Sequence, residues 1–238
     1  MRHVIRVSVL FALSAIVIQP ATAAPRKPHS VVLGAVHQEP YSQQGDPAGF
    51  ETGDETTLPV RALLVNGVFK EWTTGDNHDV TDRSFVVREA IRMNNALPGD
   101  KKESWVWQRG PWLLVNRDTG RATALKLRDY DPAVSEVSWF RDFAAYCGVT
   151  PSGKSLYAVV EEISARKAVL AKKLVTFDAE NHPDPACGPA EWQREPLRVT
   201  FHPAGMDAVA FDIDSGSAVQ VEGSGGGPRT PAALPKVK

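Results

Sequence analysis

The chain of 238 residues carries 27 Lys and Arg against 28 Asp and Glu, which gives a formal net charge of −1 at pH 7. A protein that binds nucleic acid through its phosphates needs a basic excess or a basic patch. The sequence shows neither, so we expect no nucleic-acid partner and a near-neutral surface of mixed charge.

The first 23 residues resemble a secretory signal peptide. Arg2 and Arg6 precede an apolar run from Val7 to Ile18, and the small residues Ala21-Thr22-Ala23 follow it. The apolar run is shorter than the roughly 20 residues that span a bilayer. We therefore predict a periplasmic or extracellular protein without a stable membrane span after cleavage, which would take the formal charge from −1 to −3.

The two cysteines, Cys147 and Cys187, both lie in the predicted mature protein. In an oxidising compartment the first interpretation is a structural disulfide that closes a loop of about 40 residues. The alternative is a pair of unconnected thiols or a redox pair, although their separation is far from a Cys-x-x-Cys motif.

The mature chain divides into three parts by composition. Residues 24–57 contain one strand candidate, 31–37, followed by a polar loop, and residues 58–214 are expected to form a β-rich domain. Residues 215–238 are rich in Gly, Ser, Pro and Ala, which predicts a flexible tail.

The β-rich part begins with a predicted hairpin. Asn66-Gly67 separates two apolar runs, 61–65 and 68–72, and this dipeptide favours a tight two-residue turn. The polar segment 73–83 is expected to be a loop, and 84–93 is expected to be the next strand.

Three of the six tryptophans lie in the segment 104–127, which we predict to be a three-stranded meander. Its turns would be Arg109-Gly110 and Asp118-Thr119-Gly120. Trp105, Trp107 and Trp112 would then share one face. They could form a ligand-binding platform for sugar rings, or a buried aromatic cluster, and the apolar opposite face favours burial.

The rest of the chain alternates apolar runs with turns. The expected strands are 137–140, 143–149, 156–163, 168–175, 198–201 and 208–213, and 178–196 is expected to be a long loop that contains Cys187. The segment 156–175 also fits a helical stripe, so a helix is the alternative there.

Two hairpins share a strand, x-Pro-x-Gly turn, strand pattern: 149–159, with Pro151-Ser152-Gly153, and 201–211, with Pro203-Ala204-Gly205. This pattern resembles the hairpins of WD-repeat and YVTN-type β-propeller blades, which implies blade-like antiparallel units. Both turns lack the aspartate of that family. The expected fold class is therefore all-β, built from antiparallel meanders as propeller-blade-like units or an irregular β-sandwich.

Few residues suggest chemistry. His78 with Asp79, and His182 in the predicted disulfide loop, are candidate metal ligands because imidazole and carboxylate groups bind metal ions. No nucleophile, phosphate-loop or cofactor motif accompanies them, so we expect no cofactor. The sequence favours a non-enzymatic binding protein of the cell envelope, with an unknown protein or glycan as partner. The alternative is a hydrolase or metal-dependent enzyme that uses the residues near His78 and His182.

Overall fold

The computed structural model describes residues 29–47, 56–177, 185–214 and 216–221. These residues form fifteen β-strands in three antiparallel sheets, with no helix among them, which confirms the predicted all-β class. The predicted signal peptide, residues 1–23, lies outside this part of the chain. Within it, no helix is long and apolar enough to cross a membrane.

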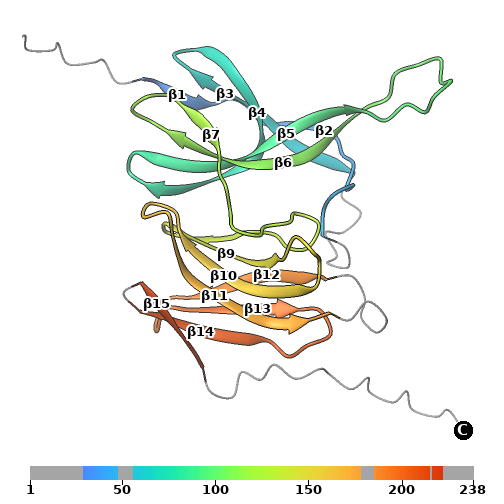
Figure 1. Cartoon of the computed structure of the whole chain (residues 1–238). Helices are drawn as coiled ribbons and strands as arrows, with labels where there is room; N and C mark the ends of the chain where they lie inside the picture. The colour runs from blue at the N-terminus through green and yellow to red at the C-terminus, as the bar shows by residue number, and fades with distance from the viewer. Residues whose placement is uncertain (1–28, 48–55, 178–184, 215, 222–238) are drawn as a thin grey trace, which may run out of the picture.

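The first sheet, which we call sheet A, contains the first seven strands (Figure 1). They are β1 (Val31–Leu33), β2 (His37–Pro40), β3 (Thr57–Val65), β4 (Val68–Thr81), β5 (Ser84–Asn94), β6 (Trp105–Asn116) and β7 (Ala122–Ala124). Both β1 and β2 pair with β3, one along each half of that strand. The N-terminal segment is thus an integral edge of the β-rich unit.

The predicted Asn66-Gly67 hairpin is confirmed. Val65 pairs with Val68 across the turn, and Asn66 and Gly67 have φ angles of 53° and 77°, as a type I′ turn requires. The expectation of a loop at 73–83 is wrong, because β4 continues through Thr81 and pairs with β5. Hairpin pairing with β5, across the turn at Asp82-Arg83, outweighs the polar composition of this segment.

The predicted turn at Arg109-Gly110 is also wrong, because β6 runs without interruption through it. Arg88 of β5 pairs with Trp112, whereas Ala90 pairs with Arg109, so β6 holds an extra residue in a β-bulge. The bulge contains Pro111, which lacks the N–H that a regular ladder would need. The expected meander is therefore one long strand, β6, followed by the short β7.

The bulge keeps the three tryptophans of β6 on one face of the sheet. Trp105 pairs with Asn94, Trp107 with Arg92, and Trp112 with Arg88. The three partners are separated by even numbers of residues along β5, so their side chains lie on the same face of the sheet. Directly paired residues project to the same side of a sheet. The predicted shared face is confirmed, although one strand supplies it rather than a hairpin.

Sheet A closes on itself at the end where β6 begins. Tyr41, directly after β2, forms a parallel bridge with Trp107, and the N–H of Ser42 donates to the carbonyl of Trp107 at 2.9 Å. Since β2 also pairs with β3, the strands β2 to β6 surround a small core. Its buried members are Leu58, Val60, Ala90 and Trp107, with Tyr41 packed against them.

The second and third sheets, sheets B and C, are four-stranded meanders. Sheet B contains β8 (Ser138–Phe140), β9 (Phe143–Val149), β10 (Ser155–Glu162) and β11 (Lys167–Thr176), and sheet C contains β12 (Cys187–Gln193), β13 (Arg198–Pro203), β14 (Val209–Asp214) and β15 (Ser217–Gln220). The hairpins predicted at 149–159 and 201–211 are the β9–β10 and β13–β14 connections. Strands rather than a helix fill 156–175.

Two boundaries in this half differ from the sequence predictions. The long loop expected at 178–196 contains β12, which pairs with β13. The tail expected from residue 215 contains β15, which pairs with β14. Both segments lack the apolar pattern from which strands are predicted, because β12 and β15 are edge strands, where few residues need to be apolar.

Sheet B lies between sheets A and C (Figure 1). One face of its central strands supplies Ala144, Tyr146 and Val159 to a core that also contains Val80 and Val86 of sheet A. The other face supplies Ala145, Ala158 and Val160 to a core that contains Phe201 and Phe211 of sheet C. Both faces of the central sheet are therefore covered, which explains its nearly continuous apolar sequence.

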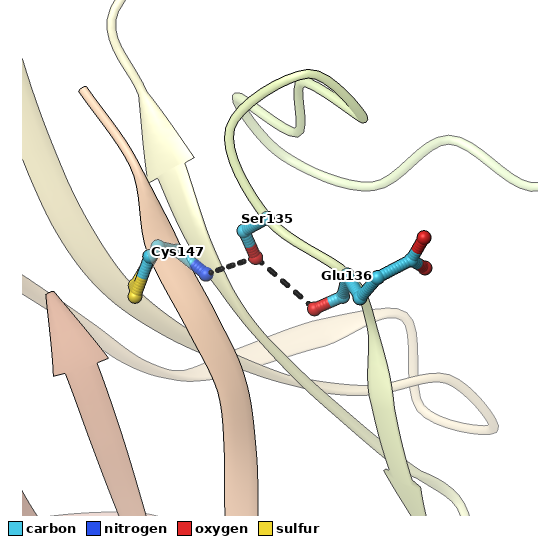
Figure 2. Close-up of a disulfide and its surroundings, with 4 residues drawn as sticks. Ser135, Glu136 and Cys147 are labelled. Carbon is cyan, nitrogen blue, oxygen red and sulfur yellow. Dashed lines mark hydrogen bonds between the residues drawn. A yellow bond between two sulfur atoms is a disulfide. The ribbon is translucent and has the colours of Figure 1, made fainter. Parts of the chain in front are cut away.

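The predicted disulfide between Cys147 and Cys187 is present, with 6.1 Å between the two Cα atoms. It joins β9 of sheet B to β12 of sheet C, and both cysteines are buried. Figure 2 shows the adjoining loop: the N–H of Cys147 donates to Oγ of Ser135 at 3.0 Å, and the Ser135 hydroxyl donates to the carbonyl of Glu136 at 3.0 Å. The buried Ser135 thus ties the loop before β8 to the disulfide strand.

A charged network joins that same loop to sheet A. Nη1 of Arg88 donates to both carboxylate oxygens of Glu136, at 2.7 and 2.8 Å, and Nε donates to the carbonyl of Gly110. Arg109 lies between two carboxylates, 3.1 Å from Asp46 and 3.8 Å from Glu136. Burial raises the pKa of Asp46 above its ordinary value, and the charge of Arg109 opposes that shift.

Candidate functional site

A pocket of about 270 Å³ opens in the closed part of sheet A. Five consecutive strands of the closed sheet contribute to its wall. The lining residues are His37 and Glu39 from β2, Val60 from β3, Trp72 from β4, Arg92 from β5 and Trp107 from β6. We call this hollow the Trp72–Trp107 pocket. The mouth of a closed or nearly closed sheet is a common position for a ligand site.

Strand register brings these side chains together. His37 pairs with Val60, and Arg92 pairs with Trp107, so each pair projects to the same side of the sheet. Val60 and Trp107 are 1% and 7% exposed and form the floor, whereas Trp72 is 38% exposed and forms a wall. The Trp72 and Trp107 rings meet edge to face with centroids 5.8 Å apart.

Exposed apolar side chains continue from the pocket along its rim. Phe69 packs against Trp72 with ring centroids 5.1 Å apart, and Trp105 is 41% exposed. The guanidinium carbon of Arg92 lies 4.8 Å from the centre of the Trp105 ring, which is a favourable cation–π distance. Exposed aromatic side chains gathered around a hollow indicate a binding surface.

The polar groups of the pocket complement its aromatic rings. Arg92 offers hydrogen-bond donors, Glu39 offers acceptors, and His37 can do either through its two ring nitrogens. Flat aromatic faces bind the apolar face of a ligand, and the polar groups at the edge orient it. The pocket can therefore bind an amphipathic ring compound without any covalent chemistry.

The structure separates the three tryptophans that the sequence offered as a ligand platform or a buried cluster. Trp107 and Trp105 lie at the floor and rim of the Trp72–Trp107 pocket. Trp112 lies farther along β6, where its ring packs edge to face against Trp139 with centroids 5.0 Å apart. That contact belongs to the core between sheets A and B, so Trp112 has a structural position.

Four pocket residues were missed from the sequence: His37, Glu39, Trp72 and Arg92. His37 and Glu39 both come from β2, whereas Trp72 comes from β4 and Arg92 from β5, and strand pairing brings the three strands together. Only Trp72 gave a usable signal in the sequence, because it ends the second strand of the predicted Asn66-Gly67 hairpin, and the structure shows that its ring is exposed.

The candidate metal ligands His78 and Asp79 are neighbours on β4 and so project to opposite faces. His78 forms a 2.6 Å hydrogen bond through Nε2 with the carbonyl of Arg141, and its ring stacks on Trp139. Asp79 forms an ion pair with Arg117. His182 lies outside the described residues. In the part of the chain that the structure describes, no group of three His, Cys, Asp or Glu side chains could hold a metal ion.

No protein-family model matches the chain, and no curated protein matches it in sequence.

Proposed function

We propose that this protein is an exported, non-enzymatic binding protein and that the Trp72–Trp107 pocket binds a glycan. The observation that carries this proposal is the composition of the pocket, in which two tryptophans meet an arginine, a glutamate and a histidine in a hollow of about 270 Å³. A sugar ring presents an apolar C–H face and equatorial hydroxyl groups, which match aromatic rings and polar side chains respectively.

The rim supports a ligand longer than one sugar unit. Trp105 and Phe69 each contact a residue that lines the pocket, Arg92 and Trp72 respectively, and they are 41% and 47% exposed. Additional rings of an oligosaccharide could stack on them while the central ring occupies the pocket. Arg92, which lies over Trp105, favours glycans that carry a carboxylate, because its guanidinium can form paired hydrogen bonds with that group.

Tryptophan fluorescence tests the glycan proposal. Titration with neutral and acidic oligosaccharides should change the emission of the wild-type protein, and Trp72→Ala should abolish the change. Trp192→Ala is the matched control, because Trp192 is a partly buried tryptophan of sheet C that stacks on Phe140. Loss of the response in the control alone, or no response of the wild type to any glycan, would contradict the proposal.

Export is supported by the buried Cys147–Cys187 disulfide, since such bonds persist in oxidising compartments. Expression of the whole chain in a bacterium should yield a periplasmic protein whose mass lacks residues 1–23. A cytoplasmic protein that retains Met1 would refute this part of the proposal and leave glycan binding untouched.

A further inference from the structure

Two hollows adjoin one another between sheets A and B. Their volumes are about 610 and 640 Å³, and both are lined by Leu114, Thr123, Ile163 and Arg166. Here the β4–β5 and β6–β7 turns of sheet A face the β10–β11 turn of sheet B. We call the hollow of 640 Å³ the arginine cleft. It lies at the far end of β6 from the Trp72–Trp107 pocket.

The arginine cleft is cationic. Arg83, Arg121 and Arg166 line it, and none of its lining residues is acidic. Hydroxyl groups also line the cleft, and they are hydrogen-bonded within the protein: Thr81 with Ser84, Thr119 with Asn116, and Ser164 with Asp142. The apolar surface comes from Val80, Leu114 and Ile163, and the polar Asn116 and Thr123 complete the lining. Three positive charges above an apolar floor suit an organic anion that carries more than one negative charge.

The arginines are available to a ligand. Among the described residues, no hydrogen bond or ion pair involves the guanidinium groups of Arg121 and Arg166. Arg83 lies 3.8 Å from Asp118, and the two side chains are 72% and 58% exposed, so this contact contributes little. By contrast, the nearby Arg117 is engaged by Asp79 and does not line the cleft.

Arg166 occupies an unusual backbone position. Its φ angle is 53°, in the left-handed region where Gly or Asn is favoured over a long side chain. The β10–β11 turn thus holds an arginine, at some conformational cost, at the place where its side chain completes the cationic wall. Asp129 and Arg141 adopt the same conformation elsewhere in the fold, so the φ angle fixes where Arg166 lies in its turn and is not itself a sign of a site.

We propose that the arginine cleft binds a phosphate-bearing ligand. Guanidinium groups form paired, charge-assisted hydrogen bonds with phosphate oxygens, and the apolar floor would hold the organic part of the molecule. The phosphate group can belong to a soluble metabolite or to a lipid headgroup. This inference concerns a second site, and it holds or fails independently of glycan binding at the Trp72–Trp107 pocket.

Calorimetric titration with inorganic pyrophosphate and glycerol 3-phosphate tests the soluble source, and cosedimentation with phosphatidylcholine vesicles containing phosphatidate tests the lipid source. Arg121→Gln and Arg166→Asn should each weaken binding about tenfold or more, because each removes charge-assisted hydrogen bonds. Asn tolerates the left-handed conformation, so Arg166→Asn preserves the turn.

Arg141→Asn is the matched control. Arg141 is also an exposed arginine in a β-turn with a φ angle of 52°, and it does not line the cleft. Binding that is lost in the two cleft variants and kept in Arg141→Asn supports the proposal, whichever phosphate source is bound. Binding that is equal in all three variants, or no binding to any probe by the wild type, would overturn it.

Discussion

Arg88 and Glu136 form a largely buried ion pair that joins sheet A to the loop before sheet B. Nη1 of Arg88 lies 2.7 Å from Oε1 of Glu136, and the two side chains are 4% and 25% exposed. Removal of one partner from such a pair leaves the other charge poorly solvated. The pair therefore stabilises the contact between the first half of the chain and the second.

Arg88→Met should lower the free energy of unfolding by about 3 kcal/mol, because Glu136 then loses its closest cation. The double variant Arg88→Met/Glu136→Met should be less destabilised than the single variant, since no uncompensated charge remains. Arg117→Met is the control, because the Arg117–Asp79 pair is exposed and should contribute about 1 kcal/mol or less. Urea denaturation measures all three, and equal effects in the two single variants would contradict the argument.

Substitution of Trp107 by alanine should destabilise the protein far more than substitution of Trp105, whereas both substitutions should weaken glycan binding. Trp107→Ala should cost about 3–5 kcal/mol, because the ring is 7% exposed and fills the core of the closed sheet. Trp105→Ala should cost about 1 kcal/mol or less, because the ring is 41% exposed. Thermal denaturation gives the first comparison. Glycan titration of Trp105→Ala should show weakened binding in a fully folded protein.

Gly120, in the β6–β7 turn, should be sensitive to a single methyl group. Its φ angle is 63°, and a Cβ atom added there would lie 2.3 Å from Cγ1 of the buried Val65. Gly120→Ala should therefore cost about 2–5 kcal/mol through backbone strain and overpacking together. Gly153→Ala isolates the backbone part, about 1–2 kcal/mol, because its φ angle is 72° and no atom lies within 4 Å of the added Cβ.

The disulfide should contribute about 4 kcal/mol, which is the loop-closure value for a separation of 40 residues. Cys147→Ala/Cys187→Ala should lose this amount in chemical denaturation. Before reduction, the denatured wild-type protein should show no titratable thiol, and after reduction it should show two. Free thiols in the unreduced protein would contradict the bond.

Asp46 gives a pH dependence of known sign. Burial raises its pKa in the folded protein above the ordinary value of 3.8. Its contribution to stability is therefore largest below 3.8 and decreases as the pH rises through the folded pKa. The stability of the wild type relative to Asp46→Asn should fall as the pH is raised through this acidic range, as measured by urea denaturation at a series of pH values.

Asp212 is the control for Asp46, because its pKa is shifted in the opposite direction. The hydrogen bond from Arg198 lowers the pKa of Asp212, so its contribution is present above the ordinary value and lost as the pH falls through the folded pKa. The wild type relative to Asp212→Asn should therefore become more stable as the pH is raised. The same slope for both variants would contradict the assignment of these shifts.

Local turn chemistry explains which parts of the fold were predictable from the sequence. Asn66-Gly67 and the Gly153 turn each encode their conformation within a few residues, and both hairpins form. Arg109-Gly110 shows the limit of this approach, because glycine also occurs in β-bulges. Only the pairing with Arg88 and Ala90, some twenty residues away, distinguishes a bulge from a turn.

The candidate site was less predictable than the fold. The Trp72–Trp107 pocket depends on the register of five strands and on the bridge between Tyr41 and Trp107. A shift of one residue in any of these strands would turn its pocket residue to the opposite face. Residue types could therefore suggest Trp105 and Trp107, but they carried no information about His37 or Arg92.

Because sheet B contributes one face to each of two cores, the chain cannot be divided into independently folding halves. A fragment that ends near Arg128 would expose Val80, Val86 and Trp112 of sheet A to water, and a fragment that begins there would expose Tyr146 and Val159. A domain inserted between sheets A and B would also expose the core that the two sheets share. The two shared cores should therefore make the three sheets unfold as one cooperative unit.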